Sequence, residues 1–126
     1  MATVQGTDQA QGIEAFFGEP VYVYSRAQAI EDGVLVDMTE WASAEKGFIG
    51  GFRVPVAMTA ALWAKVQAPK GSLQDTRGRA HDVLFMASLG VRMRKDFFKV
   101  KIGGRIHQLR VTVESDGVTV GYPGDF

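Results

Sequence analysis

The stretch that decides the fold is DFFKVKIGGRIHQLRVTVESDGVTVGY, residues 96–122. Three β-rich runs, DFFKVKI, RIHQLRVTVE and GVTVGY, are joined by GG at 103–104 and by SDG at 115–117. Short glycine-containing links between such runs are typical of β-hairpins. The sequence therefore predicts a three-stranded antiparallel meander in the last thirty residues.

Period-2 alternation assigns each side chain of this meander to a face, because successive side chains of a strand point to opposite sides. One face carries the apolar residues Phe98, Val100, Ile102, Leu109, Val111, Val113, Val118 and Val120. The opposite face carries Phe97, Lys99, Lys101, Arg110, Thr112 and Thr119, and just before it lie Arg92, Arg94 and Lys95. We expect the first face to be the core and the second to be a basic surface.

The residues before the meander contain several helix signals. Ser25 begins a capping-box pattern, and Gly33 stands where a left-handed residue ends a helix. Thr39 and Thr59 also predict helix starts, and residues 80–93 form the longest helical segment. Helices first and strands later predict an α+β fold, with the short helices packed on one face of the meander.

The composition indicates one domain. The chain has 126 residues, 46% of them hydrophobic, which suffices for a single core. Residues 1–12 are polar and rich in Gln and Gly, so we expect a flexible arm ahead of one domain over residues 13–126. No apolar run approaches the roughly 18 residues that span a bilayer, and no signal-peptide pattern is visible. With no cysteine, the chain is expected in a reducing cytoplasm, as a monomer or as a homodimer paired through the meander edge.

The net charge of zero hides a division between the two halves. Residues 1–63 hold three basic and eight acidic side chains, whereas residues 64–126 hold eleven basic and six acidic ones. A division of this size is informative about partners. The candidate acidic surface consists of Glu31, Asp32, Asp37, Glu40 and Glu45. These acids do not have the spacing of a calcium loop and no histidine accompanies them, so we expect no metal there.

The basic face of the meander allows three interpretations. Lysines and arginines beside an aromatic ring suit the phosphate backbone of a nucleic acid, and they equally suit an acidic protein surface. The same pattern also fits a solvated face whose lysines protect a sheet edge. A helix-turn-helix or RNA-recognition signature is absent. His81 and His107 occur in no catalytic motif, so we expect no catalytic residue and no cofactor.

Four segments give the chain a family resemblance. They are YSRAQAIEDGVLVD at 24–37, GFRVPVAMTAALW at 51–63, GRAHDVLFMA at 78–87 and YPGD at 122–125. Together they resemble a small family of uncharacterised function that is met in bacterial genomes, plasmids and phages. The family pattern has an aromatic residue in place of His81, which argues against a shared role for that histidine.

The resemblance implies a context and transfers no activity. Small cysteine-free proteins of mobile elements often bind a host machine, so we expect a non-enzymatic accessory protein that inhibits a bacterial defence complex, such as a CRISPR effector, by protein contact. Its partner would be a bacterial host protein or a ribonucleoprotein complex. The alternative is a nucleic-acid-binding module that uses the basic face, and a small enzyme is the third hypothesis.

Overall fold

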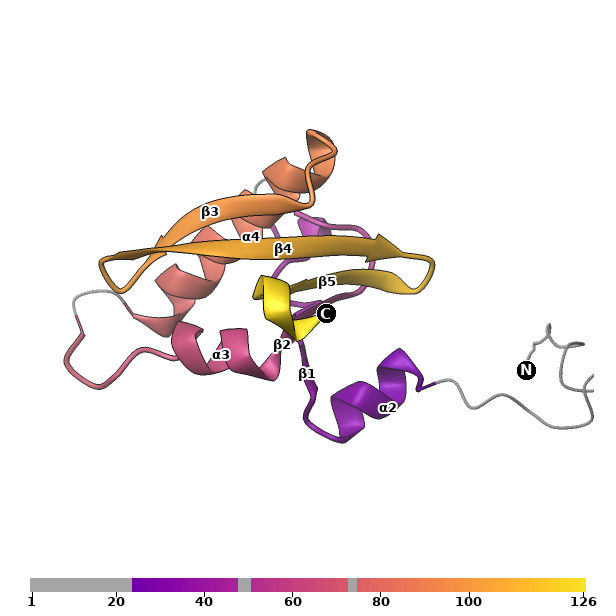
Figure 1. Ribbon diagram of the computed structural model, residues 1–126, viewed down its shortest axis with the longest axis horizontal. Helices are drawn as coiled ribbons and strands as arrows, with labels where there is room; N and C mark the ends of the chain where they lie inside the picture. The colour runs from indigo at the N-terminus through magenta and orange to yellow at the C-terminus, as the bar shows by residue number, and fades with distance from the viewer. Residues whose placement is uncertain (1–23, 48–50, 73–74) are drawn as a thin grey trace, which may run out of the picture.

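The computed structural model describes residues 24–47, 51–72 and 75–126 of the chain (Figure 1). The elements follow in the order α2 (Arg26–Glu31), β1 (Leu35–Asp37), η1 (Ala44–Lys46), β2 (Val56–Thr59), α3 (Ala60–Val66), α4 (Thr76–Arg92), β3 (Phe97–Ile102), β4 (Arg105–Glu114), β5 (Gly117–Gly121) and η2 (Pro123–Asp125). The predicted arm over residues 1–12 lies outside the described residues. None of the helices in the described ranges is long and apolar enough to cross a membrane.

The fold is α+β, as predicted, but its sheet is larger than the expected meander. Strands β3, β4 and β5 pair antiparallel, and β1 and β2 extend them to a five-stranded sheet of order β1-β2-β5-β4-β3. Val56 of β2 pairs with Val118 of β5 in parallel, so the sheet is mixed. The predicted meander is present, and only the restriction of the sheet to its three strands was wrong, because β1 has three residues and β2 has four, all four of them buried. Such short runs show no alternation that would reveal a strand.

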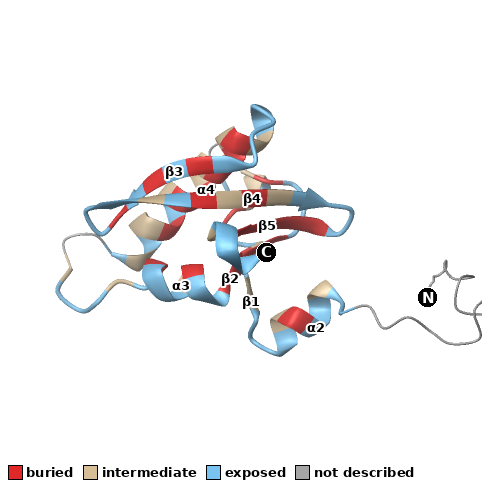
Figure 2. Ribbon diagram, viewed as in Figure 1, coloured by how far each residue is buried: buried red, intermediate tan, exposed pale blue. Residues whose placement is uncertain are grey.

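One face of the sheet packs against α3 and α4 and forms the core. Figure 1 shows α4 crossing behind β3 and β4, and the buried residues of the strands alternate with exposed ones on β3 (Figure 2). The predicted apolar face is buried as expected, except that Val113 near the end of β4 is 64% exposed. The cluster joins that face to Leu62 and Val66 of α3 and to Val83, Leu84 and Ala87 of α4.

The opposite face of the sheet is partly covered by α2 and η2. Arg26 of α2 donates to the Thr119 hydroxyl, which points away from the core because its neighbours Val118 and Val120 point into it. Asp125 of η2 accepts a hydrogen bond from the Thr59 hydroxyl on the same side. The expectation that all helices lie on one face is therefore wrong for α2.

Side-chain caps set most of the helix ends. Ser25 caps α2 as predicted, and the amides of Gly33 and Val34 close its C-terminus in a Schellman motif by donating to the carbonyls of Ile30 and Ala29. Thr59 caps α3 as predicted.

Two predicted helix starts are wrong. The Thr39 amide donates instead to the Asp37 side chain, and the turn that follows contains only the 3₁₀ segment η1. The longest helix begins at Thr76 rather than near residue 80, because the Asp75 side chain accepts from the Gly78 amide at 2.7 Å. An aspartate at this position is one of the strongest N-cap residues.

Gly121 tests the packing between the sheet and η2. A Cβ atom at this position would lie 2.4 Å from Thr59 Cγ2 and 2.7 Å from Thr59 Oγ1. We therefore expect Gly121→Ala to lower the free energy of unfolding by about 1–3 kcal/mol. Gly124→Ala is the matched control, because a Cβ there meets nothing within 4 Å. Urea unfolding of both variants measures the difference, and equal midpoints would contradict this packing.

Candidate binding surfaces

The predicted acidic residues are all exposed, and the structure distributes them over three places. Glu31 and Asp32 lie at the C-terminal end of α2, where Asp32 accepts a hydrogen bond from the Tyr24 hydroxyl at 2.7 Å. Asp37 ends β1 and holds the following turn through Thr39. Glu40 and Glu45 lie in the turns around η1. Within the described ranges no three His, Cys, Asp or Glu side chains are grouped so that they could hold a metal ion.

Arg110, predicted as part of the basic surface, is half-buried between two aromatic rings. Its guanidinium carbon lies 5.7 Å from the ring centroid of Phe97 and 5.2 Å from that of Phe126. Its Nε atom is buried and makes no hydrogen bond to the described residues. Stacking of this kind fixes an arginine by cation–π attraction. Arg110 therefore holds the C-terminal Phe126 against the sheet.

The other five predicted cations are exposed and follow one line of the structure. Arg92, Arg94 and Lys95 lie at the C-terminal end of α4, and Lys99 and Lys101 lie on the strand β3 that follows. We call this set the basic edge, because β3 is the last strand of the sheet. The basic edge is defined by Arg92, Arg94, Lys95, Lys99 and Lys101.

The turn inside the basic edge contains an unusual backbone. The amides of Arg94 and Lys95 donate to the carbonyls of Val91 and Gly90, which is the Schellman pattern seen at α2. Here the left-handed position is occupied by Arg94, with φ of 57°, where glycine is the common residue. A left-handed conformation costs a residue with a Cβ atom roughly 1–2 kcal/mol. The predicted end of this helix at residue 93 agrees with the observed C-cap Met93, although no glycine marks it.

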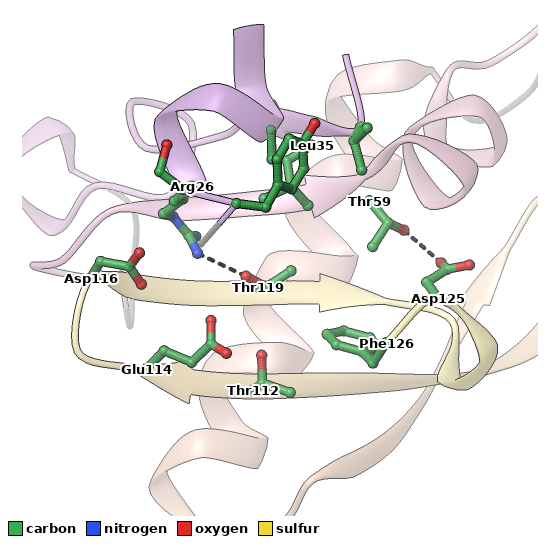
Figure 3. A pocket seen from close by; sticks show the side chains of 13 residues that line it. Arg26, Leu35, Thr59, Thr112, Glu114, Asp116, Thr119, Asp125 and Phe126 are labelled. Atoms are coloured by element: carbon green, nitrogen blue, oxygen red, sulfur yellow. Dashed lines mark hydrogen bonds between the residues drawn. The ribbon is translucent and has the colours of Figure 1, made fainter. Parts of the chain in front are cut away.

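A cleft of about 260 Å³ lies between α2, η2 and the outer face of the sheet (Figure 3). Arg26 points into it and donates to the Thr119 hydroxyl at 2.8 Å and to the Val118 carbonyl. Across the cleft, the Asp125 carboxylate accepts from the Thr59 hydroxyl and from the Tyr122 amide. These polar groups bond one another, so the cleft anchors α2 and the C-terminus to the sheet. The sequence reasoning did not single out Arg26, whose only signal was a charge inside an amphipathic helix.

A second cleft, of about 440 Å³, brings one histidine near a carboxylate. Its lining includes Glu40, Trp41, Lys46, Arg77 and His81. A shared pocket was one requirement of the enzyme hypothesis, and this cleft meets it in part. Its described lining contains no serine, threonine, tyrosine or cysteine. The arrangement offers a stacking ring and charges of both signs, which is binding chemistry.

His107 is tied into the core at another place. Its Nδ1 atom lies 2.9 Å from the Tyr122 hydroxyl, at the junction of β4 and η2. Burial raises the pKa of the Tyr122 phenol above its ordinary value, and the charge of Asp125 raises it further. The phenol therefore stays protonated at neutral pH and can donate to the imidazole. The two histidines thus sit on different elements, with His81 beside Asp82 on α4.

The comparisons with known proteins give one family and no function. A family of unknown function, DUF6573, matches residues 13–116. Neither a curated protein nor a solved structure matches the chain.

Arg26 provides a test of the anchoring cleft. Because its guanidinium makes two hydrogen bonds to β5, we expect Arg26→Met to lower the free energy of unfolding by about 1–2 kcal/mol. Amide hydrogen exchange in α2 should become at least about fivefold faster, which corresponds to about 1 kcal/mol. Arg53→Met, at an exposed arginine, serves as control. Unchanged exchange in α2 would show that Arg26 does not anchor the helix.

Proposed function

We propose that this chain, which belongs to the family of unknown function DUF6573, is a non-enzymatic binding protein that acts by covering a surface of another protein. The basic edge is the surface that we assign to this role. Neither cleft holds a recognisable catalytic arrangement among the described residues, and the cleft at Arg26 is partly occupied by groups that stabilise the fold. Binding is therefore the activity that the described residues support best.

The observation that carries the proposal is that Lys99 and Lys101 are exposed and form no ion pair with a described residue. Both side chains are exposed on the last strand of the sheet, and neither has an ion-pair partner among the described residues. Arg110, in contrast, is committed to two aromatic rings. A row of exposed cations attracts an acidic surface and speeds encounter with it.

The strained backbone at Arg94 supports the same surface. A glycine would relieve the left-handed conformation, yet the position holds a cation in the middle of the basic edge. Strain of this kind gathers at functional sites, where the side chain is needed despite its cost. The positive charge at position 94 is the property that a glycine would lose.

The biological setting is a further part of the proposal. The bound partner is a bacterial host protein or ribonucleoprotein complex, and the binding serves a mobile genetic element as an anti-defence function. Support comes from the family resemblance and from the small size of the domain.

A second mode uses the exposed acids Glu31, Asp32, Asp37, Glu40 and Glu45 to mimic phosphates in a nucleic-acid channel. Their distribution over three places favours the basic edge over this mode.

A nucleic-acid-binding function is the alternative, and the same exposed lysines favour it. This alternative predicts a specific dependence of the binding affinity on salt concentration. Binding to a duplex must weaken with salt, with a log–log slope near −0.9 for each phosphate contacted. Titration of a 30-base-pair duplex at several salt concentrations measures that slope.

Charge reversal tests the assignment of the basic edge. We expect Lys99→Glu/Lys101→Glu to reduce capture of the partner from a nuclease-treated bacterial lysate at least about tenfold, since each like-charge contact costs binding energy. Lys65→Glu/Lys70→Glu makes the same change of charge at exposed lysines outside the basic edge, and it should capture the partner normally. Equal capture by both variants would reject the basic edge. Loss of all capture on nuclease treatment would favour the alternative.

Arg94 and Arg92 provide a matched pair that separates stability from binding. Arg94→Gly relieves the left-handed strain and should raise the free energy of unfolding by about 1 kcal/mol. Arg92→Gly puts glycine into the last helical residue of α4 and should lower it by about 0.5–1 kcal/mol. Both remove one charge from the basic edge, so both should weaken partner binding. Unchanged binding in both variants would show that these arginines lie outside the interface.

A further inference from the structure

Along β3, successive residues direct their backbone amides and carbonyls alternately toward β4 and toward the outer edge of the sheet. The Val111 amide donates to the Asp96 carbonyl, so this pair is hydrogen-bonded across β3 and β4. Hydrogen-bonded pairs recur at every second residue of an antiparallel ladder. Phe98, Val100 and Ile102 therefore bond to β4, in register with Leu109, His107 and Arg105. The amides and carbonyls of Phe97, Lys99 and Lys101 point the other way, toward the outer edge.

A groove runs beside this edge. It has a volume of about 260 Å³ and lies between α4 and β3. Phe85 and Met86 of α4 give it an apolar wall, Asp82 lies on the same wall, and Val100 forms part of the opposite wall between the two lysines. Figure 1 shows β3 as the outermost strand with α4 passing behind it. Recognition by strand addition needs two features. One is a sheet edge whose backbone groups have no partner, as here among the described residues, and the other is a groove beside it that holds side chains.

We propose that the outer edge of β3 binds an extended acidic segment of the partner protein as an added, antiparallel strand. This inference rests on the proposed function and specifies how the basic edge is used. Partner residues opposite Lys99 and Lys101 carry carboxylates, because side chains of paired residues lie on the same face of a sheet. The partner residue between them points to the α4 side and places an apolar side chain against Phe85 and Met86.

The charges select such a partner over a second copy of this chain. Two β3 strands that pair antiparallel about Lys99 put the two copies of Lys99 opposite each other, and pairing about Val100 puts Lys99 opposite Lys101. Like charges directly opposite destabilise a strand pair. The lysines therefore oppose self-association, and they favour a strand with acids at alternate positions.

The probe for this inference is the peptide acetyl-Ser-Glu-Val-Glu-Val-Glu-Ser-amide, which carries acids and apolar residues in the required alternation. Two further versions are methylated on backbone nitrogen, one at the glutamates and one at the valines. In the proposed register the glutamates lie opposite Lys99 and Lys101 and use their own amides to bond β3. The valine amides point away from β3. The two methylated peptides have the same side chains and the same charge, and they differ by one N-methyl group.

Fluorescence anisotropy of the labelled peptides with the full chain gives the expected result. Methylation of the glutamates should weaken binding at least about tenfold, because at least two backbone hydrogen bonds are lost. Methylation of the valines should change binding by less than about threefold, since no bond to β3 is removed. Lys99→Glu/Lys101→Glu should abolish binding of the parent peptide.

Two outcomes overturn strand addition. Equal affinity of both methylated peptides would mean that the peptide is held by its charges alone. Loss only on valine methylation would instead overturn the proposed register, in which the acids lie opposite the lysines. Failure of the parent peptide to bind the unmodified protein also overturns it. The proposed function is judged separately, by capture of the lysate partner with the charge-reversed variants. A partner lost on charge reversal, together with peptides that show no methylation pattern, would retain the proposed function and reject the added strand.

Discussion

The parallel pairing of β2 with β5 is the contact on which the rest of the structure depends. It makes β5 a central strand and joins the first part of the described chain to the C-terminal meander. All five residues of β5 are buried, and glycines stand at both of its ends. A Cβ atom at Gly117 would come within 2.6 Å of the Pro55 carbonyl oxygen, which accepts from the Val118 amide. Only a strand without side chains at these positions lets β2 and η2 approach so closely.

The strand order keeps the strands of the two sequence halves apart. Strands β1 and β2 from the acidic half lie together on one side of the sheet, and β5, β4 and β3 from the basic half lie on the other. The strands of the two halves are therefore not interleaved in the sheet. With β5 at the centre, β3 becomes the outer strand, and its lysines lie at the opposite edge of the sheet from Asp37 of β1. Charges of the two halves nevertheless meet elsewhere, because Arg26 shares a cleft with Glu114 and Asp116, and Glu40 shares another with Arg77.

Local patterns of the sequence predicted the faces of the meander and the caps at Ser25 and Thr59, because each of these depends on residues close together in the chain. The pairing of residue 56 with residue 118 joins positions far apart in the sequence, and a four-residue strand has too short a pattern to predict it. Thr39 looked like a cap, but the neighbouring Asp37 side chain accepts its amide. Alternation placed Arg110 on the basic face, yet it could not reveal that Phe126 folds over that arginine. The groove between α4 and β3 likewise depends on how the helix packs against the strand, which the sequence pattern does not indicate.

An outer strand must avoid indiscriminate pairing and still be able to pair with its partner. Lysines at alternate positions of β3 meet both requirements, because they repel a second copy and any basic strand but attract an acidic one. The apolar wall of Phe85 and Met86 adds a demand on the side chain between the acids, so charge alone is insufficient for tight binding. The left-handed turn at Arg94 sets the position where β3 begins and places another cation there. Selectivity in this arrangement comes from the register in which the partner strand pairs with β3. A shift by one residue would turn the acids toward the apolar groove and the apolar side chain toward the lysines.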